Sequence, residues 1–274
     1  MKIKYLGTAA AEGFPAMFCD CENCRKAFKR KGRDIRSRSQ AIIDDSLLID
    51  FPCDTYYHCL NNNINLHDIH NCIVTHEHFD HFYLIDLRYF RAGISHPAPD
   101  YKFNLYGSSD IGKKMKDLPE GVFKHLNFIE IKPFEPFKVE KYTITPLKAY
   151  HGTENPLIYA VSDGEKSILY AHDTDIFREE TWEYMKQNKM YFDLVSLDCT
   201  EGAHEDLAYH GHMCLGRNVS CRDRMLKENL IDENTIVVLN HFSHNGISAN
   251  YTDFQPIAAE KGFETSYDGM EIVL

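Results

Sequence analysis

The run HEHFDH at positions 76–81 places three histidines and an aspartate within six residues of one another. Imidazole nitrogens and carboxylate oxygens are the donors that proteins use to bind divalent zinc or manganese. The run follows a short apolar stretch that predicts a buried strand, and residues two apart on an extended chain project to the same side. His76 and His78 should therefore face one position, whereas Asp80 and His81 on the following turn can face a neighbouring one. One short peptide can thus contribute ligands to two adjacent metal ions.

Two adjacent metal ions need more ligands than this peptide supplies, and the chain offers three further candidates. His151, Asp173 and His241 each lie just after a stretch that predicts a β-strand. Loops at the ends of rigid elements are where α/β proteins commonly place functional residues. We therefore predict a dinuclear metal site with seven ligands: His76, His78, Asp80, His81, His151, Asp173 and His241.

A second group of potential metal ligands lies in the first 25 residues, where Cys19, Cys21 and Cys24 are closely spaced. Three thiolates at such spacing are typical of a closed structural zinc site, which needs a fourth donor. A histidine is a natural fourth donor, and the candidates include His244, three residues after His241. The other six cysteines are interpreted as small core residues: Cys53, Cys59, Cys72, Cys199, Cys214 and Cys221.

The strands that must position these residues occur in groups, with helices between the groups. Such grouping predicts an α/β (α+β) fold with two packed sheets and helices outside them, rather than a doubly wound sheet. The expected strands cover 2–6, 39–44, 47–50, 72–75, 103–106, 142–149, 157–161, 167–171, 194–197, 235–239 and 270–273. Helical patterns cover 82–90, 109–117, 178–188, 217–229 and 253–261. No repeat or long linker divides the chain, so we expect one domain spanning residues 1–274.

The composition is that of a globular protein, with 43% apolar and 26% charged residues and a formal net charge of −11. Proteins that bind duplex nucleic acid usually carry a basic face, so this balance argues against a large nucleic-acid footprint. Eight basic residues do cluster between positions 25 and 38, either as a solvated helix and loop or as a patch that attracts phosphate. No stretch approaches the roughly 20 apolar residues of a membrane span, and no signal peptide is visible, so we expect a cytoplasmic protein.

The ligand pattern resembles that of the metallo-β-lactamase superfamily, in which an aspartate after a strand precedes the histidine-rich run. Here the aspartate is Asp50, and the pattern continues with the run at 76–81, His151, Asp173 and His241. The resemblance implies a four-layer αβ/βα sandwich with the metals at one edge of the two sheets.

Three further segments are similar to the PhnP branch of this superfamily, a cyclic-phosphate phosphodiesterase type associated with the carbon–phosphorus lyase pathway of phosphonate metabolism. These segments are Gly7-Thr8 with the cysteine cluster, His241-Phe242-Ser243-His244, and Tyr267-Asp268-Gly269-Met270-Glu271-Ile272. Residues 53–70 and 82–101 show no obvious match to the branch, which leaves the substrate open.

The resemblance also implies how the ligands are shared. It assigns His76, His78 and His151 to the first metal. It assigns Asp80, His81 and His241 to the second metal, with Asp173 bridging. A structural zinc would be held by Cys19, Cys21, Cys24 and His244. The resemblance points to His212 as an active-site histidine that contacts the substrate phosphate or the leaving group, with His210 as a close rival.

Phosphodiester hydrolysis is the predicted reaction, because two cations neutralise the substrate anion and activate a bridging water to the hydroxide that attacks phosphorus. Asp80 would orient that hydroxide, and His212 would assist the leaving oxygen near neutral pH. Asp50 would hold a ligand histidine in one tautomer. We expect a small-molecule phosphodiester substrate, such as a cyclic ribosyl phosphate, and two manganese or zinc ions plus one structural zinc as cofactors.

Three alternatives to this function stay open. A tRNA 3′-processing nuclease shares the ligands but would need a projecting basic arm to hold its substrate. The sequence contains no long basic insertion rich in glycine and proline that could form such an arm. A thioester or lactone hydrolase shares the ligands without needing His212. A sensor or partner protein without metals would not need the complete ligand set. We expect no membrane partner and no large nucleic acid, and we leave a homodimer open.

Overall fold

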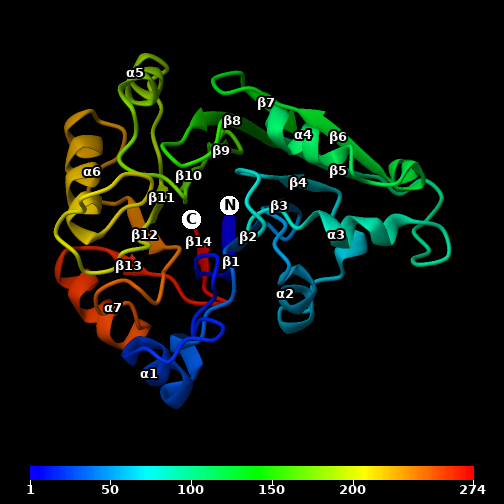
Figure 1. Ribbon diagram of the computed structural model, residues 1–274. Coiled ribbons are helices and arrows are strands. Elements are labelled where there is room, and N and C mark those ends of the chain that lie inside the picture. Colours follow the sequence, from blue (N-terminus) through cyan, green and yellow to red (C-terminus); the bar gives the residue numbers. More distant parts are fainter.

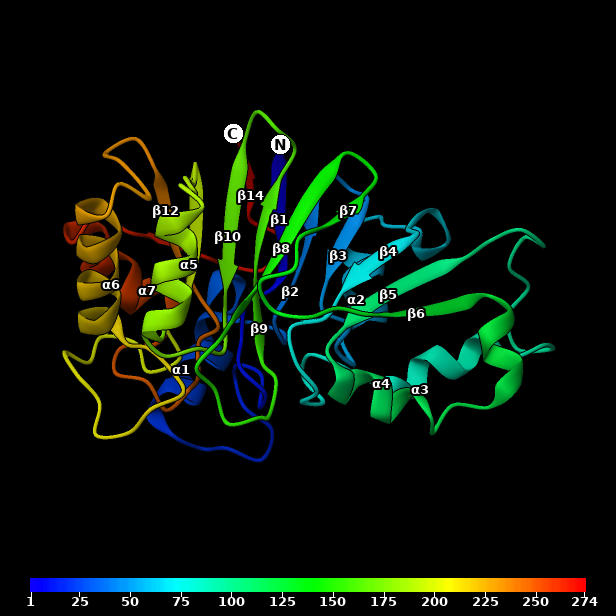
Figure 2. The ribbon, with the colours of Figure 1, turned by 90° about the horizontal axis from the view of Figure 1, so that it is seen from above.

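Two mixed β-sheets face each other in this computed structural model, which describes residues 1–274. Helices cover the outer side of each sheet, so the molecule has four layers (Figure 1, Figure 2). In spatial order, the seven strands of the first sheet are β14 (Glu271–Val273), β1 (Lys2–Gly7), β2 (Gln40–Ile43), β3 (Leu47–Ile49), β4 (Asn71–Ile73), β5 (Phe103–Gly107) and β6 (Leu126–Glu130). Those of the second are β13 (Glu264–Thr265), β12 (Ile236–Asn240), β11 (Leu194–Asp198), β10 (Ser167–Ala171), β9 (Leu157–Ser162), β8 (Tyr142–Lys148) and β7 (Phe137–Val139). The predicted α/β sandwich is confirmed.

The strands that precede the run at 76–81, Asp173 and His241 each have a parallel neighbour. By contrast, β8, which precedes His151, pairs antiparallel with both β7 and β9. In the first sheet β3, β4, β5 and β6 form parallel pairs, and in the second sheet β10, β11, β12 and β13 do so. Antiparallel pairs complete both sheets, including the pair of β1 with β14, which brings the two ends of the chain together (Figure 1). Because parallel strands end at a common edge, the loops after β10, β11 and β12 leave the second sheet side by side.

Both faces of the central strands are buried, since each sheet packs against the other sheet on one side and against helices on the other. In β3, Leu47 and Ile49 pack between the sheets while Leu48 faces outward, as the two-residue period of a strand requires. In β9, Tyr159 faces inward and Ile158 faces outward. This double burial explains why these strands appear in the sequence as continuous apolar runs.

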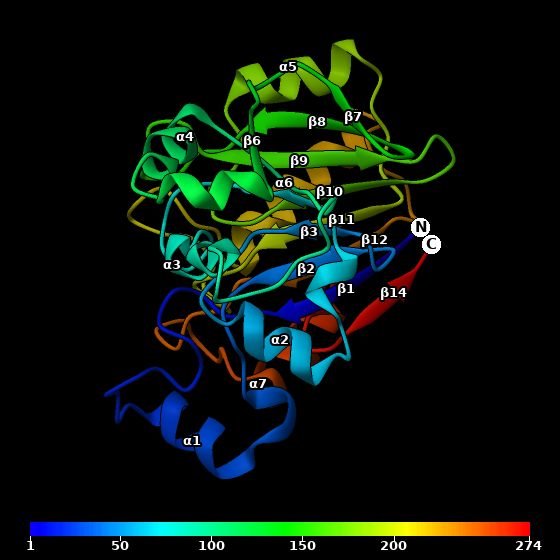
Figure 3. The ribbon, with the colours of Figure 1, turned by 90° about the vertical axis from the view of Figure 1, so that its right-hand side faces the viewer.

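Six helices fill the two outer layers: α2 (Thr55–Asn61), α3 (Leu84–Leu87), α4 (Ser109–Met115), α5 (Glu179–Gln187), α6 (Leu215–Lys227) and α7 (Tyr251–Glu260). The helix α1 (Glu22–Arg30) lies at one end of the sandwich, where it packs in a small cluster of its own (Figure 1). Trp182 of α5, Met225 of α6 and Phe254 of α7 pack into the core outside the second sheet. Leu87 of α3 and Ile111 of α4 pack outside the first sheet, and α2 lies on the same side (Figure 1, Figure 3). No helix has both the length and the apolar character needed to cross a membrane.

One boundary next to the site differs from the prediction. The strand expected at 72–75 ends at Ile73 in the structure, so it does not run directly to His76. The reason is that the chain crosses between the sheets here: the carbonyl of Thr75 accepts a hydrogen bond of 2.9 Å from the N–H of Leu157 in the second sheet. The sequence patterns also missed α2, β6, β7 and β13.

Candidate metal centre

The first group of donors contains His76, His78 and His151, whose ring nitrogens lie within 4.8 Å of one another. His78 Nδ1 lies 2.9 Å from His76 Nε2 and 3.3 Å from His151 Nε2. Burial, reinforced by the neighbouring His81, lowers the pKa of His76 well below its usual value, so its ring is neutral at physiological pH. Neutral imidazoles with converging nitrogens fit a shared cation. The structure thus brings together the three residues that the resemblance assigns to the first metal.

The second group joins two carboxylates and two imidazoles from four buried residues, Asp80, His81, Asp173 and His241, again with donor atoms within 4.8 Å of one another. His81 Nε2 lies 3.3 Å from Asp80 Oδ2, and His241 Nε2 lies 3.1 Å from Asp173 Oδ2. Although burial opposes ionisation, His241 and His81 hold the pKa of Asp173 well below its usual range. Two anionic oxygens and two imidazoles fit a divalent cation such as zinc or manganese.

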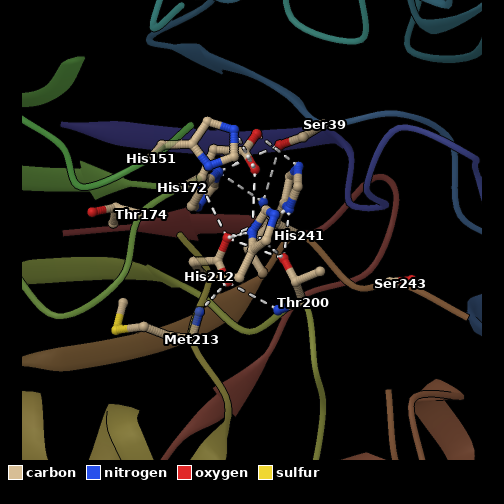
Figure 4. A network of polar contacts seen from close by, with 12 residues as sticks. Ser39, His151, His172, Thr174, Thr200, His212, Met213, His241 and Ser243 are labelled. Atoms are coloured by element: carbon tan, nitrogen blue, oxygen red, sulfur yellow. Dashed lines mark hydrogen bonds and ion pairs between the residues drawn. The ribbon is translucent and has the colours of Figure 1, made fainter. Parts of the chain in front are cut away.

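Asp173 lies between these two groups. Its Oδ2 is 3.1 Å from His241 Nε2 and 3.7 Å from His76 Nε2, while its Oδ1 is 3.8 Å from His151 Nε2. In Figure 4, His151 and His241 converge on this region from different elements. One carboxylate therefore reaches both groups of donors, which is the position of the bridging ligand that the resemblance implies.

Three residues at strand ends turn their side chains into the site with an uncommon backbone conformation. Asp50, Asp173 and His241 have φ values of 70°, 48° and 65°, in the left-handed region that residues other than glycine rarely adopt. Such conformations cost about 1–3 kcal/mol each and persist where the surrounding contacts hold them, most often at functional sites. The backbone is thus shaped to present these three side chains at one edge.

Asp50 supports the second group without belonging to it. Its carboxylate accepts hydrogen bonds from the N–H and the hydroxyl of Thr75, at 2.8 and 2.9 Å, and lies 2.7 Å from His81 Nδ1. A carboxylate that accepts from Nδ1–H fixes the histidine tautomer and leaves Nε2 as the donor to a metal. The geometry agrees with the role that the sequence predicts for Asp50.

Asp198, which the sequence analysis missed, organises the other side of the site. Its carboxylate accepts hydrogen bonds from the backbone N–H groups of Met213 (2.9 Å) and Asp173 (3.1 Å), and it lies 3.2 Å from His212 Nδ1. The hydroxyl of Thr200 connects Asp198, at 3.1 Å, to the imidazole of His241, at 2.9 Å. Asp198 is the last residue of β11, just as Asn240 is the last residue of β12. A polar residue at the end of an apolar strand is therefore the sequence signal that could have identified Asp198.

The structure separates the two rival histidines of the loop before α6. His212 is only 24% exposed, and its Nδ1 lies 3.3 Å from Asp173 and close to Asp198 (Figure 4). Burial disfavours the charged ring, but Asp198 outweighs it and raises the pKa of His212 to about 9. His210 is 65% exposed and pairs with Asp175 instead. His212 is therefore the histidine that faces the metal ligands.

The cysteine cluster and His244 form a third group of donors within 4.8 Å of one another. His244 Nδ1 lies 3.5 Å from Cys19 Sγ and 3.4 Å from Cys21 Sγ, with Cys24 completing the group. The ligands of a tetrahedral zinc, with bonds of about 2.0–2.3 Å, are about 3.5 Å apart. Although burial opposes ionisation, hydrogen bonds from Cys24 and His244 lower the pKa of the Cys21 thiol to about 6, whereas burial raises the pKa of Cys24 to about 12. The four residues fit the predicted structural zinc.

Replacing Cys21 with serine should remove about one zinc ion per chain and lower Tm by at least about 5 °C, because a structural zinc contributes directly to folding free energy. Elemental analysis and thermal unfolding measure these effects. Cys53→Ser is the matched control, since Cys53 is a half-buried cysteine that belongs to no group of possible metal donors. Turnover per folded molecule should stay within about twofold of the native protein, and a well-folded Cys21→Ser protein without turnover would show that the zinc site is not merely structural.

The basic cluster between positions 25 and 38 does not form a free phosphate-binding patch. Lys26 lies 2.8 Å from Glu22, and Arg30 lies 2.9 Å from Asp253. Arg36 is buried and donates to the carbonyl of Ser266. Much of the positive charge on and after α1 is therefore paired with carboxylates or buried, which favours the interpretation as a structural helix and loop.

Comparisons with known proteins agree with this geometry. Residues 54–231, more than half of the chain, match the Beta-lactamase superfamily domain. A curated relative, an octanoyltransferase of Porphyromonas gingivalis (strain ATCC BAA-308 / W83), is 30% identical over 205 residues, which are 70% of this chain and 38% of that protein. The chain thus spans well under half the length of that relative.

Two solved structures share the fold over the whole chain. A crystal structure of a diphosphatase from the PhnP family has a TM-score of 0.76 and 19% identity, covering 100% of this chain and 97% of the other. Zn(2+)-bound PqqB from Methylobacterium extorquens has a TM-score of 0.75 and 18% identity, covering 100% of both chains. With the domain match and these folds, the resemblance predicted from the histidine-rich run is confirmed: the chain belongs to the beta-lactamase superfamily.

Proposed function

We propose that this protein is a dinuclear metal-dependent phosphodiesterase that hydrolyses a small phosphodiester, such as a cyclic ribosyl phosphate. The observation that supports it most is the position of His212. Its Nδ1 lies 3.2 Å from Asp198 and 3.3 Å from Asp173, so its Nε2 is the nitrogen left to meet a substrate. A proton donor beside a two-metal ligand set suits a reaction in which an alkoxide must leave.

Two divalent ions, manganese or zinc, would supply Lewis-acid stabilisation of the phosphodiester anion and activation of water. The chain's own residues would hold and orient the reactants. Asp80, at the edge of the second group, would hold the attacking water in line by accepting its hydrogen bond. Asp50 holds the Nδ1 side of His81, and Asp198 holds the Nδ1 side of His212. Each carboxylate thereby fixes the tautomer of its histidine, so that both histidines present Nε2 to the active site.

The rival functions lack a comparable observation. A nuclease for large RNA would need a free basic surface, whereas the basic residues around α1 are largely paired with carboxylates. The curated relative is named for octanoyl transfer, but the chain covers only 38% of it. An esterase or lactonase acts on an uncharged group, whereas, despite burial, Asp198 raises the pKa of His212 to about 9, so that its ring carries a positive charge that suits a phosphodiester anion.

We also propose that the protein works in the cytoplasm. None of the nine cysteines forms a disulfide bond, and six of them, including Cys199 and Cys221, are buried. A chain rich in free thiols suits a reducing compartment.

The metal content and the substrate class can be tested together. Protein purified without chelator and reconstituted with manganese and zinc should contain about three metal ions per chain, measured by elemental analysis. It should then hydrolyse bis(p-nitrophenyl) phosphate and a ribosyl cyclic phosphate. p-Nitrophenyl octanoate and a lactone serve as controls for the rival hydrolases. About one ion after reconstitution would contradict the dinuclear site, and turnover of the ester or lactone alone would contradict the phosphodiesterase.

A further inference from the structure

A cavity of about 680 Å³ lies on the outer side of the first sheet, separate from the metal centre. It is lined by the end of β3, by α2 and α3, and by the start of β5, and none of the predicted metal ligands is among its lining residues. Figure 1 shows α2 and α3 on the same side of β3 and β4. The volume is within the range of about 300–1,000 Å³ that small-molecule sites occupy, whereas well-packed interiors leave few voids larger than a water molecule.

The walls of the cavity come mainly from two segments, residues 53–70 and 82–101. Most of the lining is apolar or aromatic. Tyr56 and Tyr89 are 71% and 54% exposed although they belong to the lining, so their rings stand at its mouth. The cavity is therefore open to solvent and rimmed by aromatic rings.

Asp86 is the one acidic residue among the lining residues, which include no lysine or arginine. Its carboxylate has no hydrogen bond or ion pair within the chain, and burial raises its pKa. The other groups that could carry charge there are two histidines. His67 stacks on Tyr101 with ring centroids 4.5 Å apart, and its Nε2 accepts a hydrogen bond of 3.3 Å from the N–H of Ala98.

A carboxylate in an apolar wall costs free energy unless a partner of opposite charge meets it. Aromatic faces attract cations as well, and a carboxylate set among aromatic rings is the arrangement that recognises alkylammonium groups. An anionic ligand would instead meet the repulsion of Asp86 without a compensating lysine or arginine. The chemistry of the lining thus selects for a positive charge carried on an apolar body.

We propose that this cavity is a binding site for an organic cation, a protonated or quaternary amine on an aliphatic or aromatic body. The ammonium group lies against Asp86 and the rings at the mouth. The apolar body fills the interior formed by Phe51, Leu87 and Phe103.

Calorimetric titration of the metal-loaded protein with three probes of one chain length tests this site: octyltrimethylammonium, octanoate and 1-octanol. The cation should bind about tenfold more tightly than the alcohol, since a desolvated cation–π and ion-pair contact is worth roughly 1–2 kcal/mol. Octanoate should bind more weakly than the alcohol. Inorganic phosphate at saturating concentration should leave the affinity for the cation unchanged, because the cavity contains no metal ligand.

Asp86→Asn should remove the tenfold advantage of the cation while leaving the affinity for 1-octanol unchanged. Asp68→Asn is the matched control, because Asp68 is an exposed carboxylate in the same region that does not line the cavity. Asp86→Asn should fold and should raise Tm slightly at neutral pH, since it removes a charge that burial penalises.

This gain in Tm should be present at neutral pH and vanish below about pH 4, where the carboxyl group is protonated in the folded and unfolded chain alike. Any of five results would overturn the proposal. They are equal affinity for the cation and the alcohol, tighter binding of octanoate than of the alcohol, an unchanged affinity for the cation in Asp86→Asn, displacement of the cation by phosphate, and no binding of any probe.

Discussion

Replacing Asp80 with alanine should lower kcat/KM for a phosphodiester by about 10³-fold or more while leaving the fold intact. The Asp80 carboxylate is 4% exposed and lies 3.3 Å from His81 Nε2, within the second group of donors. Two-metal stabilisation of a phosphoryl transition state is worth several kcal/mol, and each 1.36 kcal/mol is a tenfold change in rate. Apart from the contact with His81, the side chain holds no other element in place, so its loss should not unfold the protein.

The measurement combines steady-state kinetics, metal analysis and thermal unfolding of the same preparations. Asp80→Ala should retain the structural zinc, lose about one of the two active-site ions and keep Tm within a few degrees of the native value. Glu77→Gln is the matched control from the same peptide, because Glu77 pairs with Lys114 at 3.4 Å and belongs to no group of donors. Substantial turnover in a folded Asp80→Ala protein would exclude Asp80 from the catalytic centre.

The fold and most of the donor positions can be predicted from the sequence because their determinants are local. The spacing of the run at 76–81 places its ligands within one turn of the chain, whatever surrounds it. His151, Asp173 and His241 can be added because each follows an apolar strand, and the parallel strands β10 and β12 end at one edge. In each case a short stretch of sequence determines the local geometry on which the prediction depends.

The features that could not be predicted depend on contacts between distant segments. Asp198 follows the same strand-end pattern as Asp173, but its role appears only when the loop before α6 returns to place His212 beside it. The premature end of β4 depends on the hydrogen bond between Thr75 and Leu157 of the second sheet. The cavity beside α2 and α3 likewise depends on how residues 53–70 and 82–101 pack against the first sheet, which no spacing in the sequence encodes.

The zinc group and the metal centre share one loop, because His241 belongs to the active-site donors and His244, three residues later, belongs to the zinc group. The N–H of Phe242 donates to the carbonyl of Thr8 at 3.0 Å, and the N–H of Ser243 donates to the carbonyl of Thr200 at 3.1 Å. These bonds fix the backbone on the far side of His241, and His244 then joins the cysteines. The loop is thereby fixed between a ligand of the active-site group and a ligand of the structural group.

Replacing His212 with alanine should reduce kcat/KM about 10²–10⁴-fold for a phosphodiester with an alkyl alcohol leaving group, and much less for bis(p-nitrophenyl) phosphate. A general acid contributes that factor when the leaving oxygen must be protonated, whereas p-nitrophenolate leaves without a proton. His212 is placed for this role, because Asp198 holds its Nδ1 at 3.2 Å and the ring lies against His151 and His241, with centroids 5.0 and 6.0 Å away.

The comparison between the two leaving groups distinguishes proton donation from other roles of His212. Metal content should not change in His212→Ala, since seven other residues supply the donors. His210→Ala is the control two positions away, and the exposed His210, paired with Asp175, should show a much smaller loss that is the same for both substrates. An equal large loss on both substrates in His212→Ala would assign His212 to binding the phosphate rather than to the leaving group. No loss on either substrate would remove His212 from the reaction, and with it the main support for a phosphodiesterase over an esterase built on the same ligands.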